Sequence, residues 1–156
     1  MAEHVHRRPK MFPPPEFPPR KPARFARTPP AVFPVILGLF GVGLALRRGL
    51  ETAGMPGGLA DLVLGAVAVL WGYAVFAYLA KMARRVSVIL DDLRILPGRA
   101  GLAAATMGLL ALAAALVPVS QPLAQGVLVV GLLAHGLVML AAVRVLLSLP
   151  PEGRGV

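Results

Sequence analysis

The sequence predicts an all-α integral membrane protein with four transmembrane helices arranged as two hairpins. Residues 100–143 contain no Lys, Arg, Asp or Glu, and as a helix this run is about 66 Å long, roughly twice the ~30 Å hydrocarbon core of a bilayer. Pro118 and Pro122 interrupt it once, which indicates a turn between two spans. The chain is 57% hydrophobic and only 15% charged, whereas soluble domains carry about 25% charged residues.

The charge balance indicates membrane lipids as partners. Sixteen Lys and Arg residues stand against seven acidic residues, for a net charge of +9. In a soluble protein such an excess would suggest nucleic acid, but beside apolar spans it favours anionic lipid headgroups, and we expect no nucleic acid partner. The absence of cysteine excludes disulfides and thiolate metal sites.

Residues 1–30 are predicted to form a basic, proline-rich cytoplasmic arm that is disordered or lies along the membrane surface. The four-helix domain follows at 31–148, and its first span is placed at 32–48. Pro29 and Pro30 suit the helix start, where a missing N–H costs little. Arg47 and Arg48 close the span and can snorkel to the headgroups.

The second span is placed at 60–81, with Asp61 as its N-cap. Trp71 lies near the middle of this span, so we expect it to pack against a neighbouring helix rather than to lie at the membrane interface. The segment 83–97 is predicted to be an amphipathic surface helix. Its adjacent acids, Asp91 and Asp92, point in different directions on a helix and are expected to pair with nearby basic residues.

The third span, 100–117, is rich in Ala and Gly, so we expect it to face protein on most sides. The fourth, 122–144, is bulkier and suited to lipid contact, and residues 149–156 form a cytoplasmic tail. Four spans place both termini and the 83–97 linker on one side. Only Arg47 and Arg48 of all the basic residues then fall on the other side, so the positive-inside rule predicts that both termini are cytoplasmic.

His135 is a candidate polar site because an ionisable group near the middle of a span is costly in lipid. It could handle protons or line an aqueous path, but a hydrogen bond to an adjacent helix is the preferred interpretation. Six basic residues flanking the spans are candidates for lipid-headgroup binding: Arg20, Lys21, Arg24, Arg27, Arg84 and Arg85. Catalytic motifs such as a P-loop, GxSxG or HExxH are missing from the sequence, so we expect no enzyme activity, no cofactor and no metal site.

Several stretches of the chain carry a family resemblance in a fixed order: Phe33-Pro34, the run 37–47, Trp71-Gly72 and the linker 87–94. They resemble the tellurite-resistance/dicarboxylate transporter family, which includes the slow anion channels of plant guard cells. The first span resembles the opening helix of that family through Phe33-Pro34 and the run 37–47, and the linker through 87–94. The second span and the start of the fourth are also similar, through Trp71-Gly72, Phe76-Ala77, Lys81, Arg84 and Gln121-Pro122-Leu123-Ala124. Together the similar stretches extend over residues 33–148.

This resemblance implies a fold of ten helices in five hairpins around a central pore, lined by the odd-numbered helices. The chain contains two of the five hairpins, so we expect a truncated or partial family member, and the family's pore-plugging phenylalanine belongs to a helix that lies beyond these two. The first and third spans would line the pore, which makes Gly38, Gly41, Thr106 and Gly108 pore-lining candidates. The alternative for the glycines is helix packing, and for Thr106 a bond to its own helix backbone.

Passive permeation of anions or oxyanions across a bacterial inner membrane is the function that the resemblance implies. A path would require a homo-oligomer or a larger membrane complex, because two hairpins do not enclose a pore. The alternative is a non-transporting small membrane subunit that scaffolds a larger complex.

Overall fold

The structure of the protein is a computed structural model that describes residues 29–84 and 87–148, and every regular element in these ranges is an α-helix. The helices are α1 (Val32–Thr52), α2 (Gly58–Arg84), α3 (Val88–Arg94), α4 (Leu96–Leu116) and α5 (Gln121–Ser148). Four of them, α1, α2, α4 and α5, are long and apolar enough to cross a membrane. The prediction of an all-α protein with four helices long and apolar enough to span a membrane is confirmed. The predicted arm at 1–30 lies almost entirely outside the described residues, as does the tail at 149–156.

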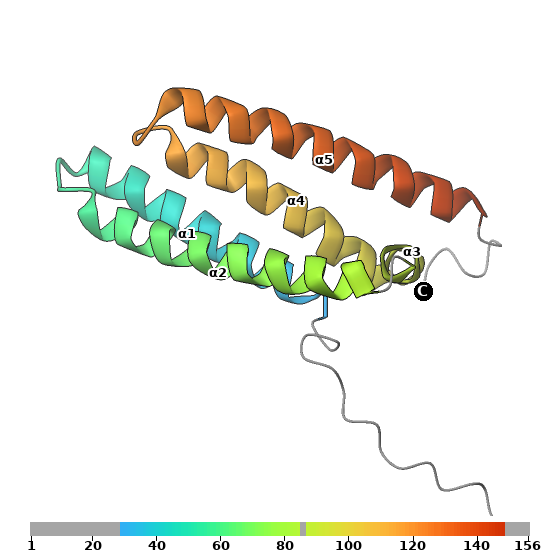
Figure 1. Cartoon of the computed structure of the whole chain (residues 1–156). Helices are drawn as coiled ribbons and strands as arrows, with labels where there is room; N and C mark the ends of the chain where they lie inside the picture. Colours follow the sequence, from blue (N-terminus) through green and yellow to red (C-terminus); the bar gives the residue numbers. More distant parts are fainter. Residues whose placement is uncertain (1–28, 85–86, 149–156) are drawn as a thin grey trace, which may run out of the picture.

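The long helices run up and down, and their connections alternate between the two ends of the bundle (Figure 1). The α1–α2 loop and the α4–α5 turn lie at one end, which we call the loop end. The short helix α3 lies at the other end, beside the end of α5, and we call this the α3 end. The predicted pairing of spans into two hairpins is therefore confirmed.

Helix α4 occupies the centre of the bundle and contacts all four other helices, whereas α5 contacts only α4 and α3. The buried residues of α4 are mostly small, as expected for a helix that faces protein on most sides: Gly98, Gly101, Leu102, Ala104, Gly108, Ala113 and Ala115. In α5, by contrast, only Ala124 and Gly131 are buried. Most of the bulky aliphatic side chains of α5 thus point outward, where lipid would solvate them.

Helix α1 packs through one side only. Phe33, Ile36, Phe40 and Gly43 are buried, and their spacing of three and four residues places them on a single face. The helix ends after Thr52 because Gly54 adopts a left-handed conformation with φ of 67°. The Gly54 N–H donates to Glu51 O at 3.1 Å and the Met55 N–H to Leu50 O at 2.9 Å, which is a Schellman C-cap. The cap explains why α1 extends beyond the predicted limit at residue 48.

Of the predicted surface helix over 83–97, the structure has a separate helix at Val88–Arg94, while residues 83–84 belong to α2 and residues 96–97 to α4. Ile95 has extended backbone angles of φ −106° and ψ 143°, and α4 begins directly after it. Pro97 lies in the first turn of α4, where proline is tolerated, so this helix begins at Leu96 rather than at residue 100. Helix α2 likewise begins before its predicted start, at Gly58, so Asp61 lies within the first turn and is not the N-cap.

Candidate functional site

Thr106 of α4 and His135 of α5 form a polar pair between the two helices of the second hairpin. Their Oγ1 and Nδ1 atoms are 2.8 Å apart. The Thr106 hydroxyl also lies 2.9 Å from Ala103 O and 3.3 Å from Leu102 O of its own helix. When the hydroxyl donates to a backbone carbonyl, its oxygen accepts from an Nδ1–H of the imidazole. The predicted backbone bond of Thr106 and the predicted interhelical bond of His135 are both confirmed.

We expect the Thr106→Val substitution to lower the free energy of unfolding by about 1 kcal/mol, because single interhelical hydrogen bonds in membranes contribute on average ~0.6 and at most ~1.7 kcal/mol. Unfolding by dodecyl sulfate in mixed micelles measures this change. In a double-mutant cycle with His135→Leu, the effect of Thr106→Val should nearly vanish. Full additivity of the two substitutions would show that the pair contributes nothing.

Trp71 of α2 anchors that helix on α4. Its indole Nε1–H donates to Ala105 O at 3.1 Å. The indole lies directly on Gly108, where an added Cβ would overlap the ring atoms Nε1 and Cδ1. The expectation that Trp71 packs against a neighbouring helix is confirmed. Only a residue without a side chain allows this contact.

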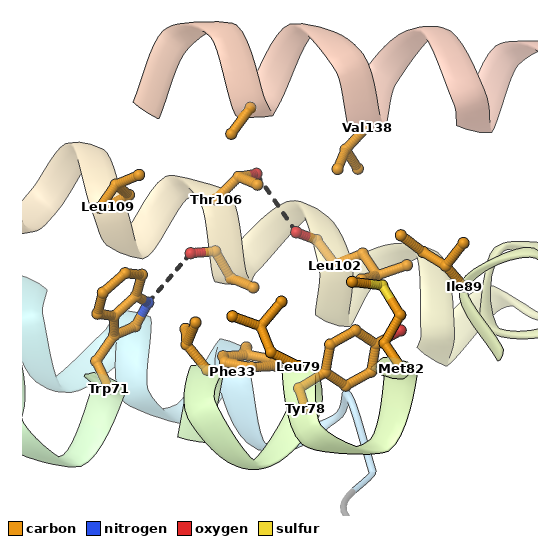
Figure 2. A pocket seen from close by; sticks show the side chains of 13 residues that line it. Phe33, Trp71, Tyr78, Leu79, Met82, Ile89, Leu102, Thr106, Leu109 and Val138 are labelled. Carbon is orange, nitrogen blue, oxygen red and sulfur yellow. Dashed lines mark hydrogen bonds between the residues drawn. The ribbon is translucent and has the colours of Figure 1, made fainter. Parts of the chain in front are cut away.

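An apolar groove of about 240 Å³ lies between α2 and α5, with α4 as its floor (Figure 2). Its lining includes Trp71, Tyr78, Leu79 and Met82 of α2, Leu102, Thr106 and Leu109 of α4, Val138 of α5, and Ile89 of α3. The Trp71 N–H and the Thr106 hydroxyl both point to α4 carbonyls, as the dashed lines show. Because these polar groups are already hydrogen-bonded, the groove presents carbon surface to a ligand.

A charged cluster joins α2 to α3 at the α3 end. The Tyr78 O–H donates to Asp92 Oδ2 at 2.9 Å, and Lys81 Nζ lies 3.6 Å from the same oxygen. Lys81 Nζ is also 5.6 Å from the centroid of the Tyr78 ring, within the range of a cation–π interaction. Asp91 instead pairs with Arg94 at 3.7 Å. The prediction that both acids pair with nearby basic residues is confirmed, and the two carboxylates do not converge on one site.

At the loop end, Arg47 connects three helices through its guanidinium group. Its Nε and Nη2 donate to Asp61 Oδ1 of α2 at 3.1 and 2.7 Å, and its Nη1 donates to Ala115 O of α4 at 3.0 Å. Arg47 follows Phe40 and Gly43 on the packed face of α1, so its side chain is only 12% exposed. The adjacent Arg48 is 79% exposed, and its Nη1 lies 3.2 Å from Glu51 Oε2.

The structure separates the four pore-lining candidates. Gly38 and Gly41 are exposed on α1, with nothing within 4 Å of an added Cβ. Thr106 faces His135, and Gly108 is buried against Trp71, so within this chain both lie at helix contacts. Pore lining itself stays a prediction for all four.

Sequence reasoning missed the role of Gly98 and Gly101 in α4. A Cβ at Gly98 would overlap the Asp92 backbone of α3, and one at Gly101 would overlap the Pro30 backbone ahead of α1. These two glycines let other segments cross the first turns of α4 at backbone distance. The sequence signal is a glycine pair at the start of an apolar run, which does not say which backbone crosses it.

Among the headgroup candidates, Arg84 is exposed in the last turn of α2 at the α3 end. The other five, Arg20, Lys21, Arg24, Arg27 and Arg85, lie outside the described residues. Within residues 29–84 and 87–148, no three His, Asp or Glu side chains gather in a way that could hold a metal ion.

Comparison with known proteins adds no relative: no family model, no curated protein and no solved structure matches the chain.

Proposed function

We propose that this protein is a membrane transport protein for small anions and that its two hairpins form part of the wall of a passive pore. The observation that carries the proposal is the uncovered side of α1. Gly38 and Gly41 are exposed there, on the side of the helix opposite Ile36 and Phe40. At these two positions no side chain projects from the helix, which suits a narrow permeation path.

The placement of the other helices supports this assignment. Helices α1 and α4 pack against each other, and α5 packs only on α4 and α3. The first and third spans, which are helices α1 and α4, therefore lie side by side, as an inner layer lining a pore requires. The similarity of residues 33–148 to the slow anion channels implies the same division into inner and outer helices.

The distribution of charge favours anions at one end of the bundle. Among the described residues, the α3 end carries Lys81, Arg84, Arg94, Arg99 and Arg144 against Asp91 and Asp92. The loop end carries Arg47 and Arg48 against Glu51 and Asp61, so its charges balance. A basic surface at this end of the bundle attracts anions to the entrance of the permeation path. By the positive-inside rule we place the α3 end in the cytoplasm of a bacterial cell.

Anion flux from proteoliposomes tests the proposal. The purified full chain should release chloride or nitrate from loaded vesicles faster than protein-free vesicles do. The Gly41→Leu substitution should reduce this flux by roughly tenfold or more, because the leucine side chain would project into a narrow path.

Gly136→Leu is the matched control. Gly136 is an exposed glycine of α5, and it too has nothing within 4 Å of an added Cβ. This variant should conduct like the unsubstituted chain. Absence of flux from a folded, monodisperse preparation would remove the proposal, as would equal loss of flux in the two variants.

The alternative, a non-transporting scaffold subunit, has one observation in its favour. Trp71, Thr106 and His135, the described side chains that carry polar atoms deep in the bundle, hydrogen-bond within the chain. A scaffold needs no polar path. Stoichiometric co-purification with a larger membrane complex, together with zero flux, would select this function.

A further inference from the structure

The groove between α2 and α5 lies between two helices that are apolar enough to cross a bilayer. Both helices are long enough to span a membrane, and the groove is lined by the middle and α3-end turns of α2 and by Ala134 and Val138 of α5. Its volume is about 240 Å³. With its carbon lining, the groove suits a thin apolar chain.

One end of the groove reaches a basic surface. Met82 in the last turn of α2 and Ile89 of α3 line that end (Figure 2). Arg84 is exposed in the same turn of α2, and Arg144 is exposed near the end of α5, which also lies at the α3 end. A ligand that fits both features has an apolar tail and a negatively charged head. Long arginine side chains at the end of a span reach the headgroup layer readily.

We propose that this groove binds one acyl chain of an anionic glycerophospholipid, with the lipid phosphate held at the α3 end by Arg84 and Arg144. The carbon lining excludes a polar ligand, because the Trp71 and Thr106 polar groups are already hydrogen-bonded to α4. The basic end selects the charge of the head. The site is independent of ion conduction and exists whether the chain transports or not.

Trp71 reports directly on the groove, because it lines the groove and is the sole tryptophan of the chain. Vesicles of one fixed mixture of phosphatidylcholine and phosphatidylglycerol are prepared in two forms, with brominated acyl chains on one lipid or on the other. Bromine quenches tryptophan on contact. For equal amounts of bromine, phosphatidylglycerol should quench Trp71 about fivefold more efficiently for each basic residue that holds its head.

Two pairs of variants separate the tail from the head. Ala134→Phe fills the groove and should lower quenching by phosphatidylglycerol to the level of phosphatidylcholine. Leu133→Phe, at a side chain that is 65% exposed on the same helix, should leave it unchanged. Arg84→Gln should lower the preference for phosphatidylglycerol about fivefold, whereas Arg48→Gln at the loop end should not.

Equal quenching by the two brominated lipids in the unsubstituted chain would overturn the proposal, because bulk lipid would then account for the signal. Quenching by neither lipid would also overturn the proposal, since protein rather than lipid would then cover the groove. Identical behaviour of Ala134→Phe and Leu133→Phe would place the lipid elsewhere. Circular dichroism checks that each variant is helical, and the comparison of the two labels needs no variant at all.

Discussion

The Gly108→Ala variant is expected to lose about 2–4 kcal/mol of stability, because overpacking a tight contact costs ~1–3 kcal/mol and an unsatisfied N–H a further ~1–3 kcal/mol. The added Cβ would overlap the Trp71 ring. An indole is rigid, so the ring must shift as a whole and its hydrogen bond to Ala105 O is lost. Since this contact joins α2 to α4, the packing of α2 on α4 is weakened near the middle of the bundle.

Unfolding by dodecyl sulfate measures the loss, and the emission of Trp71, the sole tryptophan, locates it. Gly136→Ala is the control, because an added Cβ there has nothing within 4 Å. In a helix, alanine replacing an unconstrained glycine should itself stabilise by about 0.5–1 kcal/mol. Equal stability of the two variants, with unchanged Trp71 emission, would contradict the packing role of Gly108.

The Arg47→Ala variant is expected to lose about 2–3 kcal/mol, since hydrogen bonds that involve a charged group contribute ~1.5–3 kcal/mol each before screening. The substitution removes both bonds to Asp61 and the bond to Ala115 O, and with them the tie between α1, α2 and α4. The largely exposed position of Asp61 limits the effect, because water replaces part of the lost contact.

The same unfolding assay compares Arg47→Ala with two controls. Asp61→Asn should cost less than about 1 kcal/mol, because the amide oxygen still accepts a hydrogen bond from Arg47. Arg48→Ala should change stability by less than about 0.5 kcal/mol, because that side chain is 79% exposed. Arg47→Ala and Arg48→Ala variants of equal stability would show that Arg47 does not connect the helices.

Much of the architecture could be predicted from the sequence because few backbone structures are stable in the lipid core of a membrane. A run such as 100–143 that lacks charged residues must satisfy its backbone hydrogen bonds internally, and helices do so. The contrast between the small residues of 100–117 and the bulkier 122–144 correctly indicated which helix is central. Helix ends were less predictable, because the cap at Gly54 and the extended Ile95 depend on single backbone conformations.

The candidate site was predictable only in part. Thr106 and His135 stood out as polar residues within spans. The sequence predicted a backbone hydrogen bond for Thr106 and an interhelical hydrogen bond for His135. That they bond to each other depends on the rotation of α4 against α5, which composition does not specify. The contacts of Arg47 with α2 and α4 were not predicted, for a related reason. A side chain at the end of a span can reach water or a neighbouring helix, and the face on which it lies decides the outcome.

The sequence by itself determined that the protein is helical, that four helices are apolar enough to cross a bilayer, and in which order they pair, because these properties follow from local composition and from turns. Tertiary structure alone decided that Trp71 lies on Gly108, that α3 crosses α4 at Gly98, and that α2 and α5 leave a groove between them. These features arise where surfaces distant in the sequence meet, and their fit depends on the rotation and separation of whole helices.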